Sequence, residues 1–241
     1  MANPQKTAIV TGASQGIGAG VANAFLQRGY GVVANSRNIT KSNPFPPSAN
    51  LVAVDGDIGD PNTAASIVDA ALSTFGRIDV LINNAGIFIP RPFLEYTAKD
   101  LNDLVSTTLA GFLYVSQLCV KQMLRQKNGC IVNLSTTLVG HANASAPASV
   151  QIMIKGGLDA VTRALALEYA TDGIRVNTLA AGVINTPMHK PDTHEHLKLL
   201  NPLGRLGEIP EIVNAVLFLT DATFTTGEVL HVDGGAHAGK W

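Results

Sequence analysis

The sequence has few charged residues, few aromatic residues and little net charge. Asp, Glu, Lys and Arg together make up 15% of the 241 residues, and Phe, Trp and Tyr make up 5%. The formal net charge is -1 at pH 7, so the chain lacks the basic surplus that binds nucleic acid or an anionic membrane surface. We therefore expect no nucleic-acid partner and no membrane partner.

Cysteine and long apolar runs are also scarce. The two cysteines, Cys119 and Cys130, are interpreted as core residues of a reduced protein rather than as a disulfide. No apolar run approaches the roughly 20 residues that a membrane span needs. The segment Met1 to Lys6 is short and polar, unlike a signal peptide. A cytoplasmic location is the expectation.

What the chain does have is a large apolar fraction, 46% of its residues, which is enough to bury a sizeable core. Short apolar runs alternate with segments of helical periodicity. The predicted strands are 7–10, 31–35, 51–54, 78–82, 129–134, 174–179 and 228–232. The predicted longer helices are 19–28, 93–125 (as one helix or two), 150–169 and 208–220. This alternation predicts an α/β fold with a doubly wound, mostly parallel seven-stranded sheet, in one domain over residues 1–241.

Proline indicates where helices start and where they are excluded. Asp60 and Pro61 predict a helix start, as N-cap and first helical residue. Pro44, Pro46 and Pro47 exclude a regular helix from residues 38–50. The connection between the second and third strands is therefore expected to be short or irregular.

The glycine-rich turn after the first predicted strand is the most informative stretch. It reads Thr11-Gly12-Ala13-Ser14-Gln15-Gly16-Ile17-Gly18 and precedes a helical segment. Strand, glycine turn and helix in this order present free backbone N–H groups and the positive helix end to a phosphate. Gly12 suits a tight turn, and Gly16 and Gly18 lack the Cβ that would block a close approach. The stretch predicts a dinucleotide site.

Ser36 and Arg37 stand at the end of the second strand, where such folds meet the adenosine ribose. An acidic residue there would bind the ribose hydroxyls and repel a 2′-phosphate, whereas the planar guanidinium suits a phosphate. The pair therefore favours NADP(H) over NAD(H); a surface arginine without this role is the alternative. Asp57 and Ile58 follow the third strand, where a carboxylate can reach the adenine amino group.

Six motifs, in this order and spacing, make the chain resemble the short-chain dehydrogenase/reductase family. After the glycine turn they are Asn83-Asn84-Ala85-Gly86, Lys155, Ile174-Arg175-Val176-Asn177, Gly182 with Thr186, and Val232-Asp233-Gly234-Gly235. The resemblance covers essentially the whole chain and implies an NAD(P)-binding Rossmann fold. It implies further cofactor contacts at Asn84, Ala85, Gly86, Lys155, Gly182, Ile184 and Thr186. It also implies a homotetramer built through the two long helices and the C-terminal strand region.

The family's chemistry uses an Asn, a Ser, a Tyr and a Lys, and here the chain departs from the pattern. Lys155 is present, but Gln151 stands four residues before it, where the family has tyrosine. Thr136 takes the serine position and Thr108 the Asn position. A carboxamide can hydrogen-bond a substrate but cannot supply a proton. The cofactor site is therefore expected to be intact and the proton-transfer site to be altered.

Several routes can replace the missing phenol. Lys155 can serve if burial lowers its pKa, and His141 or His189 can serve if either reaches the substrate. Each histidine can equally be an exposed loop residue. An iminium substrate needs no acid, because it already carries its positive charge. His194 and His196 flank Glu195 without metal-ligand spacing, so no metal site is predicted.

The sequence thus predicts an NADP(H)-dependent oxidoreductase that acts on a small carbonyl, alcohol or imine by a non-standard proton path. The competing hypothesis is a dinucleotide-binding subunit or regulatory protein without turnover, because three of the four catalytic positions differ from the family. The substrate pocket is expected to be hydrophobic, with ordinary core packing as the alternative reading of the same residues. Those residues are Ile87, Phe88, Leu138, Val139 and Met188.

Overall fold

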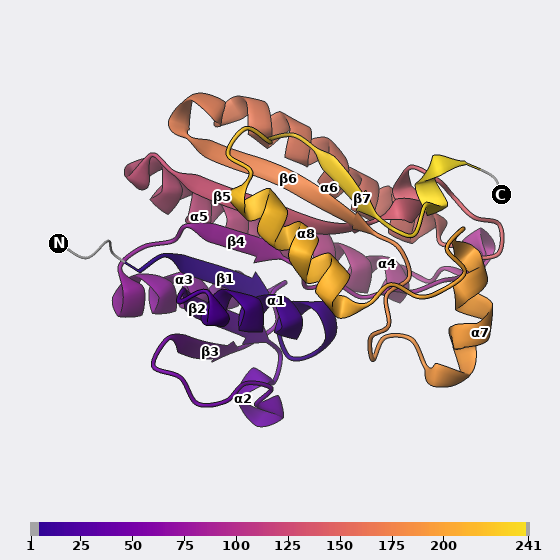
Figure 1. Cartoon of the computed structure of the whole chain (residues 1–241), viewed down its shortest axis with the longest axis horizontal. Helices are drawn as coiled ribbons and strands as arrows, with labels where there is room; N and C mark the ends of the chain where they lie inside the picture. Colours follow the sequence, from indigo (N-terminus) through magenta and orange to yellow (C-terminus); the bar gives the residue numbers. More distant parts are fainter. Residues whose placement is uncertain (1–4, 240–241) are drawn as a thin grey trace.

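A seven-stranded sheet forms the centre of the computed structural model, which describes residues 5–239 (Figure 1). All neighbouring strands pair in parallel, in the order β3-β2-β1-β4-β5-β6-β7. The strands are β1 (Thr7–Thr11), β2 (Gly31–Ser36), β3 (Leu51–Asp55), β4 (Val80–Asn83), β5 (Gly129–Thr136), β6 (Ile174–Ala181) and β7 (Val229–Val232). The predicted doubly wound fold is confirmed. Residues 1–4, part of the segment expected not to be a signal peptide, lie outside the described residues.

Helices cover both faces of the sheet. One face packs against α1 (Gly16–Gln27) and α8 (Ile209–Asp221). The other packs against α3 (Pro61–Phe75), α5 (Gly111–Gln126) and α6 (Ser149–Glu168). Along β1, Ala8 and Val10 belong to the first cluster and Ile9 to the second. Burial on both faces explains why the strands are continuous apolar runs rather than alternating ones.

The helix starts follow the predicted local rules. The Asp60 side chain accepts a hydrogen bond from the backbone N–H of Asn62, and Pro61 is the first residue of α3. The predicted helical region 93–125 contains a short turn (Phe93–Glu95), α4 (Ala98–Leu104), a π-helix (Val105–Ala110) and α5. Both cysteines are buried and free, as expected, and burial raises the pKa of the Cys130 thiol to about 11.

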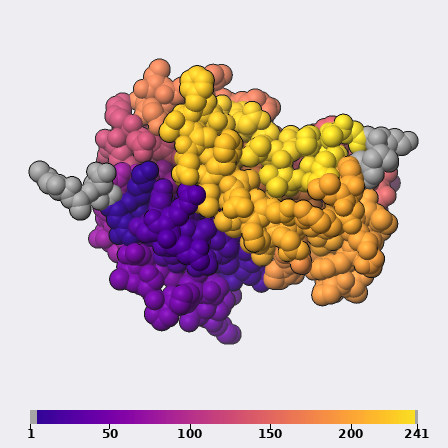
Figure 2. All heavy atoms as spheres, viewed as in Figure 1, coloured from indigo at the N-terminus to yellow at the C-terminus, as the bar shows by residue number. Residues whose placement is uncertain are grey.

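One segment differs from the sequence expectation. Within residues 38–50, where no regular helix was expected, Ile39–Ser42 forms the single helical turn α2. Proline restricts its own position and the residue before it, so a turn that ends ahead of Pro44 is allowed. The polar region after β6 contains α7 (His194–Leu197), which forms the outer surface at one end of the molecule, shown orange in Figure 2.

One helical run, Ala98–Gln126, is long and apolar enough to cross a membrane by length and composition. Of its most apolar stretch, 44% is buried inside the structure. A core helix of a soluble protein passes the same test, so this run is weak support for a membrane span. The expectation of no membrane partner stays a prediction.

Candidate functional site

A cavity of about 1090 Å³ lies at the carboxyl ends of the strands. Ligands bind at this edge of parallel α/β sheets, where the strand order reverses. The cavity is lined by all the predicted site residues except Thr108. They are Gly12, Ser14, Gln15, Gly16, Ile17, Gly18, Ser36, Arg37, Asp57, Ile58, Asn84, Ala85, Gly86, Thr136, Gln151, Lys155, Gly182, Ile184 and Thr186. The structure therefore brings together residues that are spread over more than two thirds of the chain.

Thr108 lies apart from this cavity. It is 3% exposed inside the π-helix, its Oγ1 has no hydrogen-bond partner among the described residues, and it borders a separate small void. Its neighbour Thr107 lines the main cavity instead. A π-helix has a wider turn than an α-helix and changes which side chain faces a given neighbour. The sequence pattern gave no sign of this turn.

The glycine turn has the geometry of a phosphate cradle. Gly12 has φ +66°, and a Cβ there would lie 2.8 Å from the Ala85 Cα. A Cβ on Gly18 would lie 2.3 Å from the Gly12 carbonyl oxygen. The Gln15 side chain makes no capping bond to α1. The first N–H groups of this helix therefore have no side-chain cap, and they lie at the cavity wall as donors for an anion.

Gly16 has a backbone conformation that favours glycine. A Cβ there would stand 3.5 Å from the Thr186 side chain, which is ordinary contact. Its φ of +57° lies in the left-handed region that favours glycine. The backbone conformation therefore favours glycine at this position, and the predicted room for a pyrophosphate stays a prediction.

Asn84 holds the glycine turn against β4. Its Nδ2 donates to the carbonyl oxygens of Thr11 at 2.9 Å and Gly12 at 3.1 Å. The neighbouring Asn83 donates to Asn133 Oδ1 at 2.9 Å and thereby joins β4 to β5. The two amides therefore tie β4 to β5 and to the end of β1.

The predicted adenosine end carries one free cation and one carboxylate. Arg37 is exposed and forms no ion pair with any of residues 5–239, although it lines the cavity next to Ser36. The Asp57 carboxylate accepts a hydrogen bond from the Gly59 N–H at 2.9 Å and keeps its other oxygen available. The arginine is thus available to an anionic group in the cavity.

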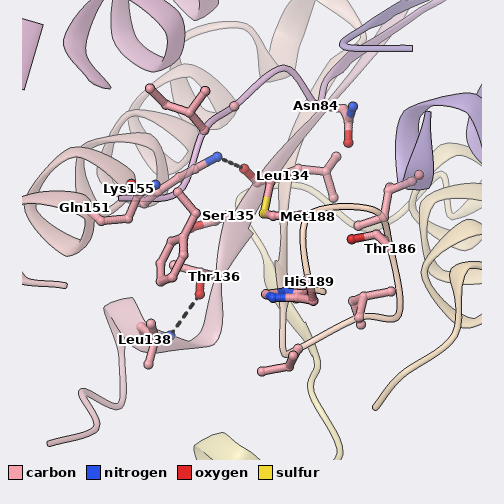
Figure 3. A pocket seen from close by; sticks show the side chains of 18 of the residues that line it. Asn84, Leu134, Ser135, Thr136, Leu138, Gln151, Lys155, Thr186, Met188 and His189 are labelled. Carbon is pink, nitrogen blue, oxygen red and sulfur yellow. Dashed lines mark hydrogen bonds between the residues drawn. The ribbon is translucent and has the colours of Figure 1, made fainter. Parts of the chain in front are cut away.

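Lys155 occupies the opposite end, where α6 meets the end of β5 (Figure 3). Its Nζ donates to the backbone oxygen of Leu134 at 2.5 Å, and the residue is 8% exposed. Burial lowers the pKa of this ammonium to about 8, and the nearby Asp159 carboxyl opposes that shift. An amine with a pKa near 8 can give up a proton close to neutral pH.

Gln151 and Thr136 lie beside Lys155 (Figure 3). Gln151 is one helical turn earlier on α6, is 2% exposed, and leaves its Oε1 without a partner in the described part of the chain. The Thr136 hydroxyl accepts a 3.4 Å bond from the Leu138 N–H, so its own hydrogen is available to a substrate oxygen. No tyrosine lines the cavity; the Tyr96 hydroxyl donates to the Ile89 carbonyl oxygen at 2.7 Å.

His141 and His189 both line the cavity. Burial, with a smaller contribution from His194, lowers the pKa of His189 below its ordinary 6.5. This shift favours the neutral form of the His189 imidazole. Residues 5–239 contain no cluster of His, Cys, Asp or Glu that could hold a metal ion.

The cavity lining also contains apolar side chains, together with polar ones such as His141, Asn143 and Ser145. Four of the five residues predicted for a hydrophobic pocket line the cavity, and Val139 does not. The apolar side chains include Ile87, Phe88, Leu138, Met188, Leu197, Leu199 and Leu200. The three leucines come from the short helical turns after β6, which sequence reasoning did not resolve.

Sequence reasoning also missed Asp159, which is buried on α6 one turn after Lys155. The spacing of four residues places the two side chains on the same helix face. The spacing can be read from the sequence, but only the structure shows that both residues are buried.

Comparison with known proteins places the chain in a family. Residues 12–237 match the family model described as enoyl-(acyl carrier protein) reductase. The 3-oxoacyl-(acyl-carrier-protein) reductase FabG of Escherichia coli (strain K12) is 34% identical over 244 residues, covering 96% of this chain and 97% of that protein. A human 3-oxoacyl-(acyl-carrier-protein) reductase is 34% identical over 232 residues, covering 95% and 97%.

Solved structures agree with these relatives. ElxO with NADP bound superimposes with a TM-score of 0.90 at 28% identity, covering 98% of this chain and 100% of that one. A 3-ketoacyl-(acyl-carrier-protein) reductase from Brucella melitensis, complexed with NADH, gives 0.87 at 28% identity and the same coverage. Together with the strand order and the cavity, these matches show that the chain belongs to the short-chain dehydrogenase/reductase family of oxidoreductases.

Proposed function

We propose that this protein is an NADP(H)-dependent oxidoreductase that acts on a small carbonyl, alcohol or imine. The observation that carries the proposal is the single cavity that contains the glycine turn and Arg37 at one end and Lys155 with Thr136 at the other. Binding residues and proton-transfer groups are thereby held at opposite ends of one site, as a dinucleotide-dependent reaction requires.

The residues present fit a nicotinamide dinucleotide. The first turn of α1, without a side-chain cap, provides N–H donors for a pyrophosphate. The close contacts around Gly12 and Gly18 keep side chains out of the path that the pyrophosphate needs. When bound, the cofactor supplies or accepts the hydride.

Arg37 determines the cofactor preference in this proposal. The similar solved structures include ElxO with NADP, its tyrosine-to-phenylalanine variant with NADPH, and a reductase with NADH. The choice therefore depends on this chain's own residues. A free guanidinium beside Ser36, with no acidic residue at the end of β2, favours a 2′-phosphate.

Lys155 is the proposed proton donor in place of the family's tyrosine, whose position Gln151 takes. With a pKa of about 8 its ammonium form predominates at pH 7, whereas burial favours the neutral form of His189. In reduction, the ammonium gives its proton to the substrate oxygen or nitrogen and later regains one from water. The Thr136 hydroxyl donates a hydrogen bond to the same substrate atom, and the Gln151 amide orients it.

The apolar side chains in the cavity lining, among them Phe88, Leu138 and Met188, favour a substrate with a hydrophobic part. The relatives named as 3-oxoacyl-(acyl-carrier-protein) reductases make 3-oxoacyl thioesters the first carbonyl compounds to test. Cyclic imines belong in the same screen, because an iminium needs no proton donor.

Two measurements test the proposal. NADPH fluorescence titration measures cofactor binding, and NADPH consumption is then followed with 3-oxoacyl thioesters, ketones, diketones and cyclic imines. We expect binding together with turnover of at least one class. Binding without turnover in either direction would instead support a regulatory or structural dinucleotide-binding subunit, and absence of binding would contradict both hypotheses.

A further inference from the structure

Asp159 is a buried charged group that the proposed function leaves without a role. It is 7% exposed on α6, and its Oδ1 has no hydrogen-bond partner among residues 5–239. Burying a carboxyl without hydrogen bonds is unfavourable, so its presence needs a reason other than packing. Lys155 lies one helical turn earlier on α6, and an interaction with its ammonium can explain the buried carboxyl.

The sheet beneath α6 provides a polar surface for this carboxyl. Ser135 of β5 pairs in register with Ala180 of β6, which pairs with His231 of β7. Leu230 and Val232 pack on the face covered by α1 and α8, so His231 between them points to the face covered by α6. The short side chain of Ala180 leaves room between the serine and the histidine.

Four groups on three elements act on the pKa of the Asp159 carboxyl. They are Lys155 and Arg163 from α6, the Ser135 hydroxyl from β5 and His231 from β7. Burial raises the pKa of the Asp159 carboxyl, and all four groups oppose that rise. Ser135 Oγ is itself buried and has no hydrogen-bond partner among the described residues. The four groups therefore do not form a closed hydrogen-bond network with the carboxyl.

Fewer groups affect the pKa of the Lys155 ammonium. Burial lowers the pKa of the ammonium, and Asp159 is the one charged group that raises it. Removing the carboxylate would therefore leave a buried ammonium with no compensating charge, and its proton would be lost at a lower pH.

We infer that Asp159 is a positioning residue that keeps Lys155 protonated and ready to donate. The inference rests on the proposed function, in which Lys155 gives the proton. The role is electrostatic. The carboxylate stabilises the charged form of the ammonium on the same face of α6, and the ammonium donates its proton to the substrate. Gln151, Lys155 and Asp159, each four residues apart on α6, then all contribute to the site.

The first experiment measures the Lys155 pKa directly and needs no turnover. The protein is labelled with an NMR-active isotope at the lysine Cε, and the Lys155 signal is assigned by its loss in Lys155→Met. We expect a wild-type pKa near 8 and a fall of about one pH unit or more in Asp159→Asn. Asp159→Glu, which keeps the charge, restores most of the wild-type value.

Glu168→Gln is the matched control, because it removes one negative charge from the exposed end of the same helix. It is expected to leave the Lys155 pKa unchanged. An unchanged pKa in Asp159→Asn overturns the inference. A wild-type pKa above 10 also overturns it, and that result does not depend on the folding of any variant.

The second experiment follows the pH profile of kcat/KM for reduction with NADPH. We expect activity to fall above a pH near 8 in the wild type, and this limb to move down by about one pH unit in Asp159→Asn but not in Glu168→Gln. An unshifted limb contradicts the inference while the proposed function stands. If no substrate is turned over, the proposed function fails and the NMR result alone decides the role of Asp159.

Discussion

At the residue scale, Arg37 is the side chain that separates the two nicotinamide cofactors. We expect Arg37→Asp to weaken NADPH binding about tenfold or more, because it removes a charge-assisted contact to a phosphate and adds a repulsive charge. NADH binding should change far less. Fluorescence titration with both cofactors measures the ratio.

Lys41→Asp is the control for this change, since Lys41 is an exposed cation on the neighbouring α2. Lys41 does not line the cavity. If the NADPH-to-NADH ratio is the same in wild type and Arg37→Asp, the guanidinium does not contact the 2′-phosphate and the cofactor assignment is wrong.

Gln151 is the second residue whose chemistry can be tested in isolation. Gln151→Tyr places a phenol one turn before Lys155, and a positioned general acid contributes roughly 10²–10⁴ in rate. We expect kcat/KM for ketone reduction to rise by about tenfold or more. The expected rise is at the lower end of that range, because the larger ring must fit a position that is 2% exposed.

Gln151→Phe adds the same ring without the hydroxyl and isolates the effect of the proton. A rise in the tyrosine variant alone supports a family-like site that lacks its usual acid. Equal rates in the two variants would mean that the pocket around α6 has a different shape from the one the ordinary mechanism uses.

At the scale of elements, a buried polar network fixes α6 to the sheet. Thr162 on α6 accepts a bond from Asn133 Nδ2 of β5 at 2.8 Å and shares another with Thr178 of β6 at 2.8 Å. Asn133 in turn accepts the bond from Asn83 of β4. The network therefore sets where α6 lies, and with it the positions of Lys155 and Gln151.

Thr162→Val keeps the shape of the side chain and removes its hydrogen bonds. Leaving buried partners unsatisfied costs about 1–3 kcal/mol, so we expect a loss of that size in the free energy of unfolding, measured with urea. Thr171→Val, on an exposed turn, should change it by less than about 0.5 kcal/mol. Equal effects of the two changes would show that the network does not stabilise the fold.

At the scale of the whole molecule, the outer helices expose large apolar side chains. Leu101 lies on α4, Leu113 on α5 and Leu167 on α6, and Phe224 follows α8. These are the two long helices and the C-terminal region through which the family resemblance implies a homotetramer. Exposed apolar groups of this kind favour burial in an interface.

We expect sedimentation velocity to give a mass four times that of the 25.2 kDa chain. Leu113→Glu should shift the protein towards smaller species, because it places a charge in the proposed interface. Leu94→Glu, on the exposed turn Phe93–Glu95, should not. A wild-type monomer at micromolar concentration would rule out the tetramer.

The sequence by itself determined the strand order along the chain, the glycine turn and most residues around the cavity. Apolar runs, proline and glycine act locally, so their effects can be read without knowing the fold. The one-turn α2 was missed because proline excludes helix only around its own position. The π-helix that withdraws Thr108 was missed because it depends on packing between α4 and α5 and the rest of the protein.

Only the tertiary structure decided the protonation chemistry. Whether Lys155 has an ordinary or a lowered pKa depends on how deeply α6 buries it and on which charges face it. Asp159 is close in sequence, but its polar surroundings come from β5 and β7, which are brought under α6 by the sheet. Burial and the sum of neighbouring charges are properties of the folded chain, and no local pattern specifies them.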